Sequence, residues 1–488
     1  MRIRHLVFTI SVVLLAFSAA LLAATLVAFW YGEGDGWAFL ATTAATATLG
    51  LIGIRTTRLE ESLSIREAYA VVSLTWIVVG VVGALPYLLS GVITSPVAAV
   101  FESASGFTTT GATVFSEIEG LPHGILFWRS LTQWLGGMGI ILLGVAILPF
   151  LGVGGMHLFR AEVPGPTPER LTPRIAQTAK LLWYVYLTLT VVLALLLLLG
   201  GMGGFDAVNH AFTTMPTGGF SPRNASIAAF DSPFIQYTIT FFMYLAGINF
   251  VLHFRALTGH PRAYLESAEW RFFSWVLAAG CALVLASVLF SGTYSLAGRP
   301  LAGFEEAFRS ALFQVVSLAT TTGYVTADYG LWPLGAQLVL IGLMFMGGMA
   351  GSTGGGIKVM RILVLFKQGV TELKRSIHPR MVTVTRLGSK ALDDAVLLNI
   401  LGFVLLFLAI FAGGVVALTF LGHDLATAVG ASVATVANIG PGIGGVGAVE
   451  NYGWMDPWSQ LLLVVLMIVG RLEIFTVLLL LHPGLWKR

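Results

Sequence analysis

The chain has 488 residues, of which 56% are hydrophobic and 10% are charged. Soluble globular domains carry about 25% charged residues, so this composition excludes a soluble protein and predicts one that crosses a lipid bilayer several times. The formal net charge is +3, and the basic residues are dispersed among short loops. The charge pattern therefore argues against a nucleic-acid partner and indicates orientation in a membrane instead.

Two apolar segments, near residues 6–30 and 37–54, come first in the chain. Each is close to the roughly 20 residues that a spanning helix needs. The first follows Arg2 and Arg4, as in a signal peptide, but its apolar run is longer than the about 7–15 residues of a signal h-region. We therefore expect both segments to be retained as transmembrane helices, in an N-terminal two-helix segment over residues 1–66.

A short glycine-containing stretch recurs four times along the rest of the chain. Aligned on Gly111, Gly218, Gly323 and Gly440, the copies are 107, 105 and 117 residues apart (218−111, 323−218 and 440−323). A period near 110 residues indicates a structural repeat. Each copy follows a short apolar helix and lies between two long apolar segments. The sequence therefore predicts an all-α polytopic membrane protein, with four pseudo-repeated helix–pore helix–loop–helix units around one pore plus two N-terminal transmembrane helices.

The four units are expected to occupy residues 67–170, 171–262, 263–390 and 391–488. Each contains an outer helix, a pore helix and an inner helix, giving ten spanning helices and four half-helices in all. In chain order these are expected at 69–90, 97–108 and 124–150; 180–200, 206–215 and 233–257; 271–291, 304–319 and 336–366; and 392–421, 424–436 and 457–482.

The recurring loops are too polar and too rich in glycine to be membrane helices. Non-helical backbone survives at membrane depth only where it is buried in protein or lines a water-filled path. Tight turns or helix-packing glycines would explain one such loop, but four at matched positions favour a ring of carbonyls, which is how a cation selectivity filter is built. The predicted ion-binding residues are Thr109, Thr110, Gly111, Pro216, Thr217, Gly218, Thr321, Thr322, Gly323, Asn438, Ile439 and Gly440.

Acidic residues are expected at the starts of the pore helices. Helix capping and pairing with the positive end of the helix dipole would explain them, and a role in drawing cations to the mouth is compatible with both. The acidic residues concerned are Glu102, Asp206, Glu305, Glu306 and Asp424.

The distribution of basic residues predicts the orientation. Of the 27 Lys and Arg residues, 21 fall at the two termini or in segments joining the units, and four fall on the side of the pore loops. Because cytoplasmic loops carry the excess of positive charge, both termini are expected in the cytoplasm. The glycine loops then open from the outside of the cell membrane.

The third inner helix contains an anomaly at residues 347–358. Six of the ten positions from 347 to 356 are glycine, and each glycine lowers helix propensity by roughly 1 kcal/mol. We expect the helix to break here, near mid-membrane, and the break to act as a movable gate; a merely kinked, closely packed helix is the alternative. The predicted gate residues in this segment are Gly347, Gly348, Gly351, Gly354, Gly355, Gly356 and Lys358.

Arg471 is a charge in the middle of the last inner helix. A charge buried in a membrane costs several kcal/mol and is usually functional and paired. We expect Arg471 to face the pore, contact the glycine-rich loop and belong to the gate; a structural pair between helices is the alternative. Glu473, two residues away, would not face Arg471 on a helix, so the two need separate partners.

These motifs together resemble the Trk/Ktr/HKT superfamily of potassium transporters, and most of all the bacterial Trk potassium uptake membrane subunits (TrkH-like). The two additional N-terminal helices favour the Trk branch over the shorter Ktr branch. The resemblance covers the chain essentially end to end, and its most specific segments are Ser105 to Val114, Thr217 to Ser221, Thr320 to Gly323, Asn438 to Gly442, residues 347–358, and Gly470 to Phe475.

The resemblance implies a homodimer in the cell inner membrane with one pore per protomer, K+ as the transported ion and no bound cofactor. It also implies regulation by a cytosolic nucleotide-binding ring protein (TrkA-like). This chain has no nucleotide site of its own, because the glycines of 347–356 lack a preceding strand and a P-loop pattern. The second loop carries Met215-Pro216 where others carry threonine, which questions equal participation of the four loops.

Other functions are less consistent with the sequence. A secondary transporter built from inverted repeats is disfavoured because the four repeats run in the same direction. An enzyme is not expected, because the histidines form no His-Glu-x-x-His pattern and no nucleophile-elbow sequence is present. A gated channel and an ion-coupled (H+ or Na+) symporter both remain open, since both can use one filter.

Overall fold

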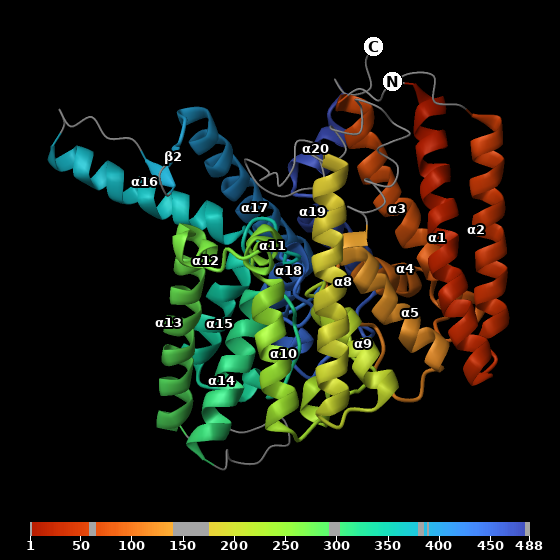
Figure 1. Cartoon of the computed structure of the whole chain (residues 1–488), viewed down its shortest axis with the longest axis horizontal. Coiled ribbons are helices and arrows are strands. Elements are labelled where there is room, and N and C mark those ends of the chain that lie inside the picture. Colours follow the sequence, from red (N-terminus) through yellow and green to blue (C-terminus); the bar gives the residue numbers. More distant parts are fainter. Residues whose placement is uncertain are drawn as a thin grey trace.

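The computed structural model describes residues 2–57, 65–139, 175–291, 303–378, 385–387 and 390–483. Within these residues the chain is nearly all helical, apart from the antiparallel pair β1 (Arg386–Leu387) and β2 (Lys390–Ala391). Helix α1 (Ile3–Tyr31) packs along α2 (Gly36–Thr56) at one side of the bundle (Figure 1). Helix α1 begins and α20 (Phe475–Leu481) ends at the same end of the molecule (Figure 1).

Four units of outer helix, pore helix, loop and inner helix follow the N-terminal pair, as predicted. The outer helices are α3 (Ile65–Leu89), α8 (Ile175–Leu199), α13 (Ala268–Ser291) and α17 (Asp394–Phe420). The pore helices are α4 (Pro96–Phe107), α9 (Gly204–Thr214), α14 (Phe304–Ala319) and α18 (Leu425–Val436). The inner helices are formed by α5 (His123–Trp134), by α10 (Pro233–Ala246) with α11 (Phe250–Leu257), by α15 (Leu334–Met346) with α16 (Val359–Ile377), and by α19 (Pro457–Arg471) with α20; the short α12 (Ala263–Glu266) joins the second unit to the third.

The units close into a ring through contacts between inner and pore helices. Helix α5 of the first unit packs on α9 of the second, α10 packs on α14, α15 on α18, and α19 of the fourth unit packs on α4 of the first. Each pore helix is thus wedged against the inner helix of the preceding unit. The fold predicted from the sequence, with four repeated units around one axis, is confirmed.

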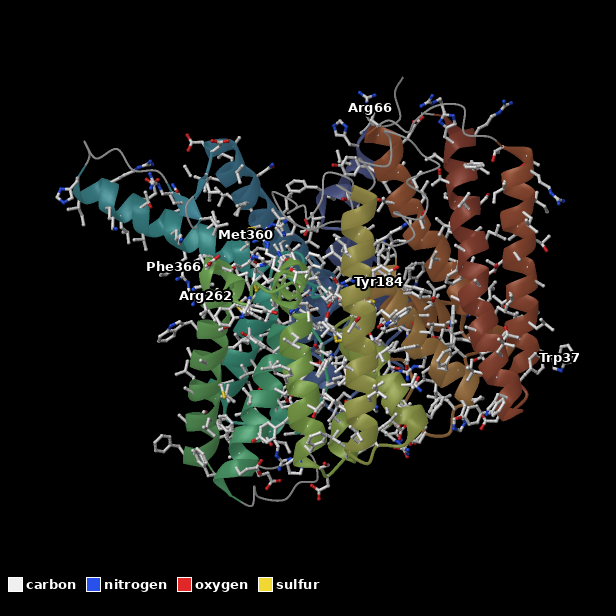
Figure 2. All side chains as sticks on the ribbon, viewed as in Figure 1. Trp37, Arg66, Tyr184, Arg262, Met360 and Phe366 are labelled. Carbon is white, nitrogen blue, oxygen red and sulfur yellow. The ribbon has the colours of Figure 1, made fainter. Side chains whose placement is uncertain are left out.

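The lipid-facing surface has the composition expected of a membrane protein. Among the described helices, α1, α2, α3, α8, α13 and α17 are long and apolar enough to cross a membrane individually. Trp37 of α2 projects outward from this surface (Figure 2), and Tyr184 of α8 is also exposed. Trp37 is 71% exposed, which would be unfavourable in water and is suited to a lipid boundary.

The inner helices differ from the prediction, which placed a break only in the third unit. In the second unit α10 and α11 meet at an angle of 103°, instead of forming one helix over 233–257. In the fourth unit α19 ends at Arg471 and α20 begins at Phe475, so Arg471 terminates a helix rather than lying inside one. In the first unit α5 continues as a π-helix over Leu135–Gly139, and residues 140–150 of the predicted helix lie outside the described residues.

In the first and fourth units the interruption coincides with a close approach between the inner helix and the end of the pore helix in its own unit, whereas Gly247 of the second unit lies against Thr320 of the third. A Cβ atom on Gly136 would lie 1.9 Å from the Phe107 carbonyl oxygen, and one on Gly470 would lie 2.0 Å from that of Val436. In the fourth unit Glu473 adopts a φ of 56°, which is incompatible with a continuing α-helix. Isolated glycines in an apolar segment are a weak sequence signal, and so these breaks were missed.

Candidate functional site

The four recurring loops adopt the same backbone conformation. In each loop a left-handed residue follows the pore helix, and a left-handed glycine comes two positions later. The first positions are Thr109, Thr217, Thr321 and Asn438, with φ of 53°, 57°, 61° and 56°. The second positions are Gly111, Gly219, Gly323 and Gly440, with φ of 80°, 79°, 78° and 101°. Non-glycine residues seldom adopt positive φ, so four matched pairs identify the loops as equivalent turns.

This pattern corrects the register predicted for the second loop by one residue. Gly219, which was not among the predicted ion-binding residues, occupies the position of Gly111, and Gly218 corresponds to Thr110. The amide of Gly219 donates to the Thr213 carbonyl at 3.2 Å, as Gly111 donates to its own pore helix at 3.5 Å. Pro216 therefore corresponds to Thr108 and precedes the turn. The sequence was ambiguous here because two glycines stand side by side.

The four turns also contact one another in cyclic order. Each left-handed glycine lies against the carbonyl of the residue before the glycine in an adjacent loop, so close that no other side chain fits. A Cβ atom on Gly111, Gly219, Gly323 or Gly440 would lie 2.0, 1.9, 1.9 or 2.7 Å from the carbonyl oxygen of Gly218, Thr322, Ile439 or Thr110, respectively. The loops thus form a closed ring, and glycine is required at each contact.

The ring is chemically less symmetric than its backbone. In the first loop the hydroxyl oxygens of Thr108 and Thr110 lie 2.7 Å apart, and in the third those of Thr320 and Thr322 lie 2.8 Å apart. The second and fourth loops have Pro216 and Gly218, and Ala437 and Ile439, at these positions. Opposite loops therefore form two chemical pairs, one with a threonine couple and one without.

Gln133 is a further contact of the ring that the sequence reasoning missed. This buried side chain of α5 donates through Nε2 to the Gly218 carbonyl at 2.7 Å, and its Oε1 accepts from the Phe220 amide at 3.1 Å. It thereby holds both sides of Gly219. The available signal was the lone amide side chain of the first inner helix, which also carries Arg129, Ser130 and Thr132.

Residues 347–358 form a non-helical segment between α15 and α16, which we call the intramembrane loop. The loop is bonded to the base of the ring. The Gly355 amide donates to the Thr321 hydroxyl at 2.7 Å, and the Thr353 hydroxyl donates to the Met215 carbonyl at 2.9 Å. Lys358, the last predicted gate residue, has a φ of 77° and donates through Nζ to the Gly354 carbonyl.

Arg471, at the end of α19, connects the intramembrane loop to the inner helix of the first unit. Its Nη1 donates to the Thr353 carbonyl at 2.9 Å, and its Nη2 donates to the Gly136 carbonyl at 2.7 Å. The carbonyls freed by broken helices are the acceptors that a buried guanidinium requires. Glu473 has a separate partner, Arg361, at 2.8 Å from Oε2 to Nη2. Both expectations, contact with the loop and separate partners, agree with this geometry.

A small cavity lies among these groups. Its volume is about 60 Å³, which is enough to admit water. Its walls are formed by Gly136 and Gly137, the loop from Ser352 to Gly356 with Lys358, and the segment from Gly470 to Glu473. The space directly below the ring is thus narrow and carries two basic side chains, Lys358 and Arg471.

The acidic residues of the pore helices divide into two groups. Asp424 caps α18 by accepting from the Thr427 amide at 3.1 Å, and hydrogen bonds from Thr427 hold the pKa of its carboxyl below the usual value. Asp206 pairs with Arg223 at 2.6 Å near the start of α9. Glu102 departs from the prediction, because α4 begins at Pro96 and Glu102 is fully buried in the middle of it.

Comparisons with known proteins agree with this architecture. The family model described as "TrkH: Cation transport protein" matches residues 37–485. The "Trk system potassium uptake protein TrkH" of Escherichia coli K12 is 43% identical, and that of Vibrio parahaemolyticus is 41% identical, each over 100% of both chains. The crystal structure of the potassium transporter TrkH from Vibrio parahaemolyticus superposes with a TM-score of 0.88 at 39% identity, again over 100% of both chains. The chain therefore belongs to the TrkH family of cation transport proteins.

Proposed function

We propose that this chain forms a potassium-selective uptake path through the cell inner membrane, with the loop ring as its selectivity filter. The observation that carries the proposal is the ring of four equivalent left-handed turns, each closed by a glycine packed on a neighbouring carbonyl. Relatives at 43% and 41% identity are named as potassium uptake proteins. The proposed filter residues are Thr109, Thr110, Gly111, Thr217, Gly218, Gly219, Thr321, Thr322, Gly323, Asn438, Ile439 and Gly440.

Carbonyl oxygens would replace the hydration shell of the potassium ion as it passes through the ring. Each pore helix ends immediately before its turn, so the negative end of each helix dipole faces the ring and favours a cation. Because each glycine packs on the next loop, the four carbonyls hold fixed spacings. A fixed cage that suits a potassium ion leaves the smaller sodium ion poorly coordinated.

The intramembrane loop and Arg471 are proposed to form the gate. In the geometry described here, Arg471 and Lys358 place positive charge directly below the ring, and the loop narrows the path to a small cavity. A cation leaving the filter would meet both a steric and an electrostatic barrier. Opening requires the loop to withdraw, which breaks its bonds to Thr321 and Met215.

The assembly and orientation belong to the same proposal. Both termini would lie in the cytoplasm, two copies would form a homodimer with one pore per protomer, and a TrkA-like nucleotide-binding ring protein would regulate the gate from the cytosol. Helix α16 leads directly from the intramembrane loop to an exposed basic segment with Lys374 and Arg375 (Figure 1). A regulator bound to α16 would therefore pull on the gate.

The proposal is tested by ion flux through the purified chain in liposomes. With a potassium gradient and neither a sodium nor a proton gradient, we expect potassium uptake that exceeds sodium uptake. In Gly111→Ser the added side chain meets the Gly218 carbonyl, and the ratio of potassium to sodium uptake should fall. An unchanged ratio in Gly111→Ser and Gly323→Ser would reject the filter, and uptake that requires a second gradient would favour an ion-coupled symporter.

A further inference from the structure

One position in each pore helix, nine residues before the left-handed glycine of the ring, carries a different kind of side chain in each unit. The four residues are Glu102, His210, Gln314 and Ala431, counted back from Gly111, Gly219, Gly323 and Gly440. All four are fully buried. The backbone conformation of the ring is therefore the same in all four units, whereas the side chain at this pore-helix position differs from unit to unit.

In three units this side chain meets the segment that leaves the ring. Glu102 accepts from the Val114 amide at 2.9 Å, three residues after Gly111. His210 lies 3.0 Å from the Ser221 hydroxyl through Nε2. Gln314, with its amide oriented so that the oxygen faces donors, accepts through Oε1 from the Thr326 amide at 2.8 Å, three residues after Gly323. Ala431 has no polar side-chain atom to offer in the fourth unit. The outgoing segment is thus bonded to a carboxylate in the first unit, an imidazole in the second and an amide in the third, and it has no polar side chain at this position in the fourth.

In the first unit this contact extends to a second loop of the ring through an ion-paired side chain, whereas His210 meets the third loop by packing its ring on Tyr324. Arg129 of α5 binds Glu102 with Nε 2.8 Å from Oε1, and both side chains are buried, with exposures of 1% and 0%. Its Nη2 donates to the Thr113 hydroxyl and its Nη1 to the Ser221 carbonyl, each at 3.2 Å. The guanidinium also lies 4.2 Å from the centre of the Phe220 ring. One buried group therefore connects the outgoing segments of loops one and two.

We propose that the Glu102–Arg129 pair is a positioning pair, which fixes the spacing between loops one and two and thereby tunes the preference of the ring for a dehydrated monovalent cation. The inference rests on the proposed function of the ring. A buried ion pair adds little net stability compared with apolar side chains of similar size, so stability alone does not explain it. The planar guanidinium, by contrast, has donors in a fixed arrangement and holds its acceptors at set positions.

The test compares variants of the full chain in liposomes. Arg129→Lys keeps the charge and loses the forked geometry, whereas Glu102→Gln keeps an acceptor and loses the ion pair. In both we expect the ratio of potassium to sodium uptake to fall about tenfold, which corresponds to the loss of about one charge-assisted hydrogen bond. The amount of folded protein, measured by size-exclusion chromatography, should remain close to that of the parent chain for Arg129→Lys.

Glu305→Gln is the matched control, since Glu305 pairs with Arg309 at 2.9 Å on another pore helix. A role in folding alone would lower the folded fraction of the Glu102 and Arg129 variants without changing the uptake ratio. An unchanged ratio in these variants, with a lowered ratio in Gly111→Ser, overturns the inference and leaves the filter intact. An unchanged ratio in Gly111→Ser as well overturns both. If Glu102→Gln does not fold, Arg129→Lys and the charge-free double variant Glu102→Gln with Arg129→Gln decide the question by the same ratio.

Discussion

The loop ring and the intramembrane loop lie against each other but are held by different kinds of contact. In the ring each turn is bonded to its own pore helix, as where the Thr110 amide donates to the Ser105 carbonyl at 2.9 Å. The intramembrane loop is held by groups far away in the sequence. Its Ala350 amide donates to Glu269 at 2.8 Å, 81 residues away, and its Thr353 carbonyl accepts from Arg471, 118 residues away.

This difference separates two properties of the molecule. The local bonds within one pore helix and its turn do not include the intramembrane loop, so we expect each turn to keep its backbone conformation when the loop moves. The bonds of the intramembrane loop are each worth about 1 kcal/mol net and have to be broken together for the loop to leave. We therefore expect that cation preference and gating can be changed independently.

The largest effect is expected from breaking the ring at its corrected register. In Gly219→Ala the new Cβ would lie 1.9 Å from the backbone oxygen of Thr322, at a φ of 79°. A left-handed non-glycine residue costs roughly 1–2 kcal/mol and overpacking a further 1–3 kcal/mol, so potassium uptake should fall about a hundredfold. Radioactive rubidium uptake into liposomes would measure this loss.

Gly218→Ala is the control for the register, because the atoms nearest to its Cβ would belong to the Gln133 side chain and not to the backbone of another loop, so that the change disturbs the Gln133 bonds but not the contact between loops. Its uptake should fall much less than that of Gly219→Ala. A larger loss of uptake in Gly218→Ala than in Gly219→Ala would instead support the alignment in which Gly218 is equivalent to Gly111.

The second largest effect concerns the gate. Replacing Arg471 with Ala removes a positive charge and its bonds to the Thr353 and Gly136 carbonyls. Since about 1.4 kcal/mol is a factor of ten, the loss of even one charge-assisted bond predicts about a tenfold rise in flux without a regulator. Shortening the loop within Gly351–Gly356 should act in the same direction. The ratio of potassium to sodium uptake should stay at the parent value in both variants.

Arg471→Lys is the matched control, because it keeps the charge and loses one of the two contacts, and its flux should rise less. Variants that express normally but conduct less than the parent chain would mean that the loop is a necessary part of the permeation path. The gate assignment would then be wrong.

The same comparison explains how much the sequence could predict. The ring could be predicted from the sequence because its motif occurs four times. A single glycine indicates little, but four glycines at matched positions indicate a repeated loop. The predicted alignment of the loops was off by one residue only in the second loop, where Gly218 and Gly219 are adjacent. The intramembrane loop could be predicted for a different reason. A segment with six glycines in ten positions is not expected to remain helical.

The contacts that occur once were not predictable. The break at Gly247–Asn249 depends on the intramembrane loop, whose Met349 amide donates to the Gly247 carbonyl, and the break near Glu473 depends on the close approach of Gly470 to the end of α18; the local sequence encodes neither. The sequence places Arg129 among the four basic residues on the side of the pore loops, and it predicts Glu102 at the start of a pore helix, as a cap or to draw cations to the mouth; neither prediction pairs the two. They meet 27 residues apart in the chain through the packing of α4 on α5. Tertiary contacts of this kind follow from the fold and cannot be read from residue patterns.

A smaller effect should distinguish the two equivalent threonines of the ring. The Thr110 hydroxyl contacts Thr108 and also accepts from the side-chain amide of Asn438, in another loop, at 2.9 Å. Within the described part of the chain, the Thr322 hydroxyl bonds to Thr320 alone. Thr110→Val should therefore lower the free energy of unfolding by about 2 kcal/mol, and Thr322→Val by about 1 kcal/mol. Thermal unfolding in detergent would compare them. Equal losses would show that the bond between the loops contributes nothing.

The smallest effect is expected at the C-terminal end of α16, away from the ring and the intramembrane loop. Lys374 is an exposed residue of α16, next to Arg375, which is bonded to Glu372 at 2.8 Å. A basic residue at a membrane surface contributes about 1 kcal/mol to attraction for anionic head groups, so Lys374→Gln should weaken phosphatidylglycerol binding about fivefold. Native mass spectrometry of the purified chain would measure this, with Arg55→Gln on α2 as the control. If both variants bind the lipid equally and a cytosolic regulator also binds both equally, the basic surface of α16 reflects only membrane orientation. Flux and selectivity without a regulator should be unchanged in both, because neither side chain touches the ring or the intramembrane loop.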